Sequence, residues 1–332
     1  MTSGTALKSE ATSGGAANGH RFHPTILREY DIRGIVGETL FPADAEAIGR
    51  AYATLLLADG GKRVCVGYDG RLSSPDLTDA LIQGLTSAGA DVQAIGLGPT
   101  PMLYFAVHHL QADGGIQVTG SHNPPDHNGF KMMLGKKPFF GERIQALGRI
   151  AADSAYRSGD GEVTEHDILD AYVDRLRSDF RDGRPLKVVW DAGNGASGEA
   201  LRALAKRLPG EHILLYADID GSFPNHHPDP TVPENLEDLI AAVREHGAEL
   251  GIAFDGDGDR IGVVDGKGRI MFGDQILQVL VTEILERLPG SPIIADVKAS
   301  QALFDAIHDL GGAPIMYKTG HSLIKTVMTE KN

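Results

Sequence analysis

Three aspartates that alternate with glycine carry the strongest chemical signal in this sequence. Asp255, Asp257 and Asp259 follow a short apolar run and are followed at once by Arg260. Carboxylates this close repel one another, and a hard divalent cation that prefers oxygen ligands, Mg²⁺ before others, is the usual way to neutralise them. The intervening glycines let the backbone turn so that alternate side chains converge. The segment predicts a metal-binding loop in preference to a solvated acidic turn.

A second segment places a serine in a turn that is dense in glycine, asparagine and proline. Residues 114–131 run from a strand into this turn, with His122 directly after the serine, and we expect Ser121 on an exposed, conformationally fixed tip. The nucleophile elbow Gly-x-Ser-x-Gly is not matched, which disfavours hydrolase chemistry. A phosphorylated Ser121 would carry negative charge and acceptor oxygens that a cation on the three aspartates, and a fork from Arg260, could meet. The two loops therefore make chemical sense as one site.

Composition limits the classes of function. The chain has 332 residues, 42% of them hydrophobic, which predicts a globular protein of two or three domains. Its formal net charge of -14 argues against a general nucleic-acid surface or an anionic membrane surface, so a small metabolite is the better partner. The one cysteine, Cys65, lies in an apolar run and fits a buried thiol in a reducing cytoplasm. No stretch of the sequence is apolar enough to span a bilayer.

A unit of strand, aspartate loop, helix and strand occurs three times. The loops begin at Asp69, Asp191 and Asp296. The expected helices are residues 76–88, 198–207 and 301–310, and the expected second strands are residues 90–95, 212–216 and 313–317. Such alternation predicts repeated mixed α/β domains with functional loops at the strand ends. In the first two units a further strand leads to Ser121 and Asp255. By the same spacing a third chemical loop would fall beyond residue 332, so we expect the third domain to be incomplete.

The gaps between the units suggest domain boundaries. We expect a disordered tail over residues 1–21, a first domain over 22–166, a second over 167–269, and a partial third over 270–332. The tail is rich in Gly, Ser, Ala and Thr and lacks the apolar segment of a signal peptide. The polar residues 153–165 are a candidate linker, although a hairpin or a short exposed strand would have the same composition.

Four motifs in this order resemble the α-D-phosphohexomutase family, and specifically its bacterial phosphomannomutase/phosphoglucomutase branch. They are an opening segment at residues 27–36, a serine loop at 119–131, the aspartate loop at 255–260, and two stretches at 296–298 and 318–322. The sequence of the serine loop, Thr-Gly-Ser-His-Asn-Pro-Pro, is similar to that of the dual mannose and glucose enzymes. The resemblance implies the repeated α/β domains of that family, with the third domain incomplete and the fourth absent.

The resemblance also implies an isomerase that works by phosphoryl transfer. Phosphate would move reversibly between the 1- and 6-positions of mannose or glucose phosphates, through phosphoserine 121 and a hexose 1,6-bisphosphate that also serves as activator. Mg²⁺ would be the cofactor. We expect a cytoplasmic monomer of carbohydrate metabolism, with hexose phosphates as partners and neither nucleic acid nor membrane.

The family motifs assign the following roles: catalysis to Ser121, His122, Lys131, Arg33 and Arg260; substrate binding to Tyr30, Lys298 and His321; and metal binding to Ser121, Asp255, Asp257 and Asp259. Lys131 is either a general base or an electrostatic partner. His122 either orients the phosphoserine, moves a proton, or is a structural residue of the turn.

Two other readings stay open at this stage. A haloacid-dehalogenase-type phosphatase would use Asp255 as its nucleophile, because an apolar strand that ends in Asp-x-Asp is its motif, but it would leave Ser121 without a role. A non-catalytic fragment that binds sugar phosphates is the other possibility, and turnover separates it from a mutase. An EF-hand is disfavoured, because Arg260 and Gly266 stand where that loop needs Gly and Glu.

Overall fold

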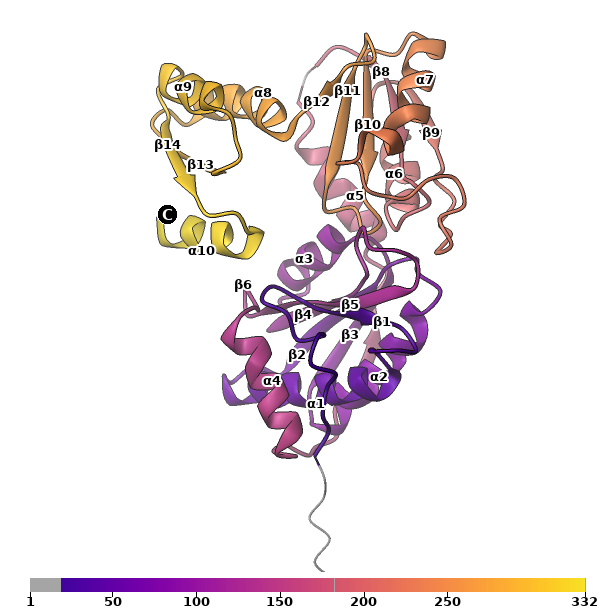
Figure 1. Ribbon diagram of the computed structural model, residues 1–332, viewed down its shortest axis with the longest axis vertical. Coiled ribbons are helices and arrows are strands. Elements are labelled where there is room, and N and C mark those ends of the chain that lie inside the picture. The colour runs from indigo at the N-terminus through magenta and orange to yellow at the C-terminus, as the bar shows by residue number, and fades with distance from the viewer. Residues whose placement is uncertain (1–18, 182, 332) are drawn as a thin grey trace, which may run out of the picture.

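The computed structural model describes residues 19–181 and 183–331, which form three α/β lobes (Figure 1). The expected tail at residues 1–21 lies almost entirely outside the described residues. No helix in the described ranges combines the length and the apolar character that crossing a membrane requires.

The first lobe is built on a mixed sheet in the order β1-β5-β4-β2-β3-β7, with β6 paired to β5. Its two faces bury different helices, because successive residues of a strand point to opposite sides. Val64 and Val66 pack with α1, α2 and α4, whereas Cys65 packs with α3. The elements are β1 (Ile32–Ile35), α1 (Pro42–Ala58), β2 (Arg63–Tyr68), α2 (Ser74–Ser87), β3 (Asp91–Leu97), α3 (Thr100–His109), β4 (Gly114–Val118), β5 (His127–Leu134), β6 (Lys137–Pro138), α4 (Glu142–Ala152) and β7 (Val163–Glu165).

Helices α1 and α2 pack closely enough to require glycine at their contact. A Cβ at Gly49 would lie 2.4 Å from the carbonyl oxygen of Leu81, and one at Gly84 would lie 2.1 Å from that of Glu46. Both distances are far shorter than a real carbon contact, so these two positions bring the helix backbones together.

The second lobe has a five-stranded sheet in the order β12-β11-β10-β8-β9. Helix α7 covers one face through Leu239 and Val243, and α6 covers the other through Leu201. The elements are α5 (Leu169–Ser178), β8 (Leu186–Asp191), α6 (Gly198–Ala205), β9 (Gly210–Leu215), the 3-10 helix η1 (Pro233–Leu236), α7 (Glu237–His246), β10 (Leu250–Phe254), β11 (Ile261–Asp265) and β12 (Ile270–Met271).

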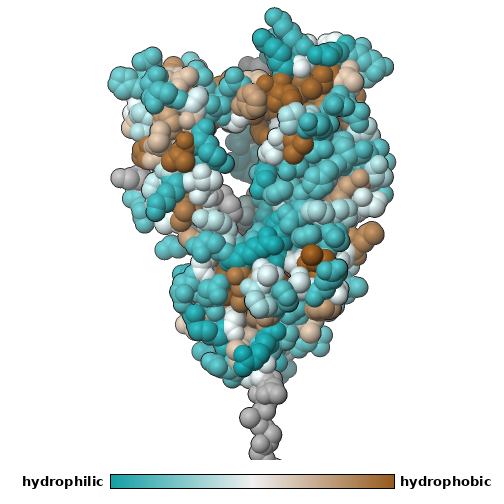
Figure 2. Space-filling model, in the orientation of Figure 1, coloured by the Kyte–Doolittle hydropathy of each residue, from teal (hydrophilic) through white to brown (hydrophobic). Residues whose placement is uncertain are grey.

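The third lobe is the smallest and holds one pair of parallel strands. Its elements are α8 (Gly273–Arg287), β13 (Pro292–Asp296), α9 (Gln301–Asp309), β14 (Ala313–Tyr317) and α10 (His321–Lys331). Helix α10 reaches toward the first lobe, where Lys325 Nζ lies 4.5 Å from the ring centre of Tyr104. Figure 2 shows the surface hollowed between this lobe and the other two.

The predicted repeat is confirmed in the first two lobes. Strands β4, β2 and β3 run parallel, as do β10, β8 and β9, and each set continues into an antiparallel partner, β5 or β11. The loops of Asp69 and Ser121 therefore leave the carboxyl ends of neighbouring strands β2 and β4, and those of Asp191 and Asp255 leave β8 and β10. This topology explains why chemically distinctive residues recur at the same place in each unit.

The polar stretch at residues 153–165 ends in a short exposed strand, one of the alternatives left open by its composition. Strand β7 pairs in parallel with β3 and extends the first sheet by one edge. Its residues are exposed on both faces, which is why the sequence there carries no apolar alternation.

Candidate active site

The serine loop after β4 and the aspartate loop after β10 meet at the junction of the first two lobes. The Ser121 hydroxyl donates a hydrogen bond of 2.8 Å to Oδ2 of Asp255. The backbones are also in direct contact, because a Cβ at Gly256 would lie 2.4 Å from the carbonyl oxygen of Ser121. Two loops 134 residues apart in the chain are thus brought into one site.

The prediction that Ser121 lies on an exposed tip is wrong. The residue is only 1% exposed, because the aspartate loop of the second lobe covers it. Its backbone is held in the left-handed region, with φ of 51°, and its N–H donates to the hydroxyl of Thr119 at 2.8 Å. A non-glycine residue in this region is costly unless its surroundings hold it there.

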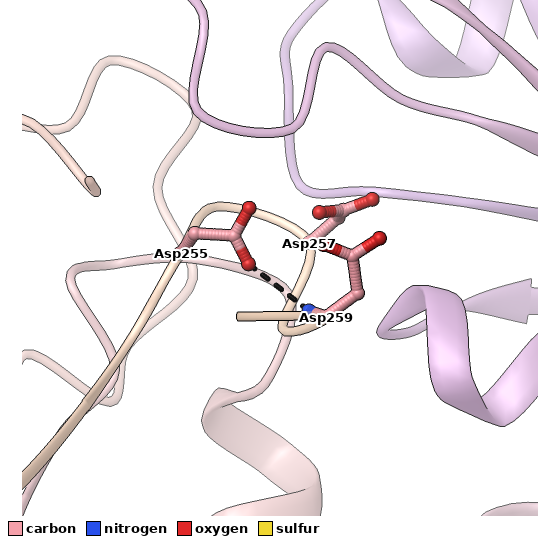
Figure 3. Close-up of side chains that lie close together, drawn as sticks. All are labelled: Asp255, Asp257 and Asp259. Atoms are coloured by element: carbon pink, nitrogen blue, oxygen red, sulfur yellow. Dashed lines mark hydrogen bonds between the residues drawn. The ribbon is translucent and has the colours of Figure 1, made fainter. Parts of the chain in front are cut away.

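The three aspartates project from one loop and offer oxygens to a common space (Figure 3). One carboxylate oxygen from each lies within 4.8 Å of the others. The other oxygen of Asp255, Oδ1, accepts N–H hydrogen bonds of 3.0 Å from Asp259 and Arg260, which fixes the turn. Thr100, at the start of α3, donates its N–H to the carbonyl of Asp257 at 2.8 Å and its hydroxyl to Oδ2 of that side chain.

This donor set fits a divalent metal ion. Asp255 and Asp257 are fully buried, and Oδ1 of Asp257 has no hydrogen-bond partner among the described residues. Buried carboxylate oxygens need a donor or a cation, and carboxylates are the ligands that hard divalent ions prefer. The triad could therefore hold such an ion, with the partnerless oxygen of Asp257 available to it.

Lys131 supplies the nearest positive charge. Its Nζ lies 2.7 Å from Oδ2 of Asp257, 2.5 Å from Oδ2 of Asp259 and 3.3 Å from the Ser121 hydroxyl. Burial opposes the charged form of Lys131, but the carboxylates of Asp257 and Asp259 outweigh it and raise the pKa of the ammonium above its usual value. In this arrangement the ammonium of Lys131 is therefore held by the carboxylates of the aspartate loop.

The carboxylates respond in opposite directions to the same surroundings. Burial, then the neighbouring charges of Asp257 and Asp259, raise the pKa of Asp255 well above its ordinary value. Burial also works against the charge of Asp257, but the ammonium of Lys131 prevails and its pKa is lowered. One ammonium among three carboxylates leaves an excess of negative charge, which a divalent cation would neutralise.

His122 and Arg260 border the serine on its exposed side. His122 Nδ1 is 3.3 Å from the Ser121 hydroxyl, and its Nε2 is 3.5 Å from NH1 of Arg260. Burial, followed by the charge of Arg260, lowers the pKa of His122 to about 4. Because the Ser121 hydroxyl donates its one proton to Asp255, a neutral imidazole can donate its Nδ1–H to that hydroxyl and accept at Nε2 from Arg260. The exposed guanidinium of Arg260 is free of the triad and faces the solvent side of the loops.

Arg33 and Tyr30 come from the segment around β1. The guanidinium of Arg33 is buried and donates to the carbonyl of Gly120 and to Oδ1 of Asn123, both at 2.9 Å, so it contacts the serine loop itself. Tyr30 lines a cavity of about 340 Å³ between the first lobe and α10, together with Lys131 and Lys325. Arg33 therefore borders the site at the serine loop, and Tyr30 borders it at this cavity.

Lys298, on the third lobe, lies apart from the two loops. Lys298 Nζ is 3.6 Å from Oδ2 of Asp296, and its side chain is 73% exposed. It lines a hollow formed by the third lobe alone, which neither the serine loop nor the aspartate loop borders. The side chain of His321 lies outside the described part of the structure. The structure therefore does not bring Lys298 to Ser121.

Three buried residues of the site were missed by sequence reasoning. Asp69 accepts hydrogen bonds from Thr119 and Gly120, and Arg71 donates to the carbonyls of the serine loop. The sequence marks this position, because Asp69 begins the loop of the first repeated unit and Arg71 follows two residues later. The pattern does not indicate which residues Asp69 and Arg71 contact. Thr100 was also missed, since a threonine at a helix start usually serves the helix.

Family models match nearly the whole chain. They describe the α/β/α domains I, II and III of phosphoglucomutase/phosphomannomutase and match residues 24–156, 170–268 and 272–332.

Individual relatives agree with these models. The chain is 48% identical to a phosphomannomutase/phosphoglucomutase of Pseudomonas aeruginosa and 47% identical to a phosphoglucomutase of Neisseria gonorrhoeae. The two alignments cover 92% and 91% of this chain and 66% of each relative. The chain thus spans just under two thirds of the length of these curated relatives.

A crystal structure of a phosphoglucomutase/phosphomannomutase family protein from Burkholderia thailandensis superposes with a TM-score of 0.91 at 46% identity. That match covers 93% of this chain and 69% of the other. The three-lobed architecture, the serine and aspartate loops that meet between the first two lobes, and these matches lead to one conclusion. The chain belongs to the phosphoglucomutase/phosphomannomutase family of α-D-phosphohexomutases.

Proposed function

We propose that this protein transfers a phosphoryl group between Ser121 and the hydroxyls of a hexose phosphate, and that it thereby interconverts the 1- and 6-phosphates of glucose or mannose. The observation that carries the proposal is the surroundings of the Ser121 hydroxyl. It lies 2.8 Å from Asp255 of the aspartate loop and 3.3 Å from the ammonium of Lys131. The Lys131 ammonium and a cation held by the aspartate loop would neutralise a phosphate on this oxygen.

The site residues predicted from the sequence each have a place in the proposed transfer. The Ser121 oxygen carries the phosphoryl group and gives it to a free hydroxyl of the sugar phosphate, and the proton of that hydroxyl ends on the serine oxygen as its bond to phosphorus breaks. Ser121 then takes the other phosphate from the bisphosphate and returns the proton to the sugar oxygen, so that one difficult transfer becomes two. Lys131 stabilises charge on the moving group, and His122 orients the serine oxygen. Arg260 faces the open side of the site, where its planar fork suits a phosphate. Tyr30 and Arg33 shape the entrance and the serine loop.

Asp255, Asp257 and Asp259 would hold Mg²⁺, with the phosphate on Ser121 as a further ligand. The ion would supply positive charge to the transferring phosphoryl oxygens. In the structure, Lys131 Nζ lies between the carboxylates of Asp257 and Asp259. A cation held by these carboxylates would compete with this ammonium for them, and would leave Lys131 available to the phosphate.

Lys298 and His321 are proposed to contact the sugar or its phosphate once the third lobe approaches the first two. Lys298 is exposed and its ammonium lies near Asp296 of its own loop, so it can exchange that contact for a phosphate. Hinge motions of whole domains around a ligand are common in enzymes that enclose their substrate.

The alternative functions are not supported. The relatives that match are named as mutases, and a phosphatase that used Asp255 as its nucleophile would need that carboxylate free. Instead, both of its oxygens accept hydrogen bonds, from Ser121 and from the backbone of residues 259 and 260.

The experiment is ³¹P NMR of glucose 1-phosphate and, separately, mannose 1-phosphate, each with Mg²⁺ and a trace of glucose 1,6-bisphosphate as activator. We expect the 6-phosphate to appear without inorganic phosphate, and Ser121→Ala to abolish the conversion. Release of inorganic phosphate would point to the phosphatase. Binding of the sugar phosphate by calorimetry without any conversion would point to a non-catalytic protein. The ratio of the two rates gives the sugar preference.

We further propose that the protein acts as a monomer in the cytoplasm, with hexose phosphates as its partners. The net charge of -14 and the single buried cysteine support this setting. Light scattering at micromolar concentration tests the monomer.

A further inference from the structure

The loop between β2 and α2 contains an arginine that the proposed transfer does not use. Arg71 is 1% exposed, so a charged guanidinium is buried in the first lobe next to the serine loop. Burying such a charge is unfavourable unless it is paired and hydrogen-bonded. Its partners therefore indicate what the position is for.

The guanidinium donates to four backbone carbonyls of the serine loop. NH2 contacts the carbonyls of Ser121 at 2.9 Å and Asn123 at 2.6 Å. NH1 contacts those of Pro124 at 2.5 Å and His127 at 2.9 Å. One planar group thus spans the whole turn from residue 121 to residue 127. Lysine cannot reproduce this pattern, since its ammonium is a single point of donation.

Asp69 holds both the arginine and the strand end that carries the serine. Its Oδ2 accepts from the Thr119 hydroxyl at 2.7 Å and from the Gly120 N–H at 3.0 Å, and lies 3.3 Å from Nε of Arg71. Its Oδ1 accepts from the Arg71 N–H at 3.1 Å. The serine is therefore fixed from both sides, before it by Asp69 and after it by Arg71.

The second lobe covers the arginine. The ring of Phe223 lies 5.3 Å from the guanidinium carbon of Arg71. A Cβ at Gly221 would lie 2.5 Å from the carbonyl oxygen of Gly70 and 2.7 Å from Cα of Arg71, so the two backbones are in contact. The conformation of the serine loop is thus linked to the contact between the first two lobes.

We propose that Arg71, paired with Asp69 and covered by Phe223, is a positioning residue that holds Ser121 in its left-handed backbone conformation for phosphoryl transfer. The expected effect of Arg71 on the phosphoryl-transfer rate rests on the proposed function, whereas its expected effect on the serine-loop conformation does not. Without the fork, the carbonyls of the turn lose their common donor and the loop relaxes. A misplacement of about 1 Å is enough to slow a transfer about 100-fold.

The test compares Arg71→Lys and Phe223→Leu with Arg50→Lys. Arg50 is a suitable control because its guanidinium also lies over an aromatic ring, that of Tyr156 at 4.1 Å, on α1. The first readout is hydrogen exchange of peptides over residues 119–128 and 253–260 without any ligand. The second is single-turnover phosphorylation of Ser121 by glucose 1,6-bisphosphate with Mg²⁺ over a range of bisphosphate concentrations.

For Arg71→Lys we expect exchange over residues 119–128 to rise at least about tenfold, because buried hydrogen bonds of that loop are lost. The saturating rate constant falls about 100-fold and the half-saturating bisphosphate concentration changes less than about threefold. Phe223→Leu changes both readouts in the same direction by less, and Arg50→Lys changes neither.

The proposal is overturned if exchange over residues 119–128 in Arg71→Lys matches that in Arg50→Lys, or if the half-saturating concentration rises while the rate constant stays the same. If Arg71→Lys does not fold, the same comparison is made with Phe223→Leu, and the proposal is overturned if its exchange over residues 119–128 matches that in Arg50→Lys. If the wild-type protein takes up no phosphate, the proposed function fails, whereas the exchange result still decides the role of Arg71.

Discussion

The contact between Gly256 and Ser121 predicts how far the rate of phosphoryl transfer falls when residue 256 carries a methyl group. A methyl group at position 256 would lie 2.4 Å from the Ser121 carbonyl oxygen, whereas ordinary contacts begin near 3.4 Å. In Gly256→Ala the two loops must therefore separate by about 1 Å, a shift that typically costs about 100-fold in rate. The hydrogen bond of 2.8 Å from Ser121 to Asp255 would then exceed the range of a real hydrogen bond.

The assay is the single-turnover rate of Ser121 phosphorylation by glucose 1,6-bisphosphate, with Mn²⁺ affinity measured by calorimetry on the same samples. Gly273→Ala is the matched control, because a Cβ at Gly273 meets nothing within 4 Å. We expect Gly256→Ala to remain folded and to lose about two orders of magnitude in rate. A folded Gly256→Ala protein with the rate of Gly273→Ala would refute the reasoning, since close loop contact would then not matter for transfer.

Three further predictions test the electrostatics and the packing. Lys131→Met removes the ammonium that contacts two of the aspartates, so Mn²⁺ should bind more tightly by calorimetry while Ser121 phosphorylation slows about 100-fold; weaker Mn²⁺ binding contradicts this. Thr100→Val leaves a buried oxygen of Asp257 without its hydroxyl donor and should lower the free energy of unfolding by about 1–3 kcal/mol in urea titrations; an unchanged value contradicts it. Burial opposes the charge of His226, but its 2.9 Å hydrogen bond to buried Asp191 prevails and raises its pKa above 6.5. The stability that this pair adds, relative to His226→Gln, should therefore be complete below pH 6.5 and lost as pH rises through the folded-state pKa; an advantage that grows toward pH 9 contradicts it.

The sequence was sufficient to predict the repeated fold and the pairing of the two chemical loops. Apolar strands, glycine-rich turns and the recurrent aspartate specify elements locally, and parallel β-α-β units bring equivalent strand ends to one edge. The strand at residues 186–191 and the strand at 313–317 are where the pattern placed them. The predicted domain boundaries at 166/167 and 269/270 remain predictions.

What the sequence did not reveal depends on contacts between the lobes. Ser121 was expected on an exposed tip because its own turn is polar, and only the docking of the aspartate loop buries it. Arg71 looks like a surface residue of a polar loop, and its burial follows from the four carbonyls and the ring of Phe223 that surround it. Such roles arise from packing between residues far apart in the chain, which leaves no periodic pattern in the local sequence.

Phosphorylation of Ser121 is best measured by peptide mass spectrometry of the protein after incubation with Mg²⁺ and glucose 1,6-bisphosphate. We expect one phosphoryl group on the peptide that contains Ser121, the release of one hexose monophosphate for each group, and no labelling in Ser121→Ala or after chelation of the metal. A folded protein that carries no phosphate on Ser121, or that carries it on Asp255, would show that Ser121 is not the phosphoryl carrier.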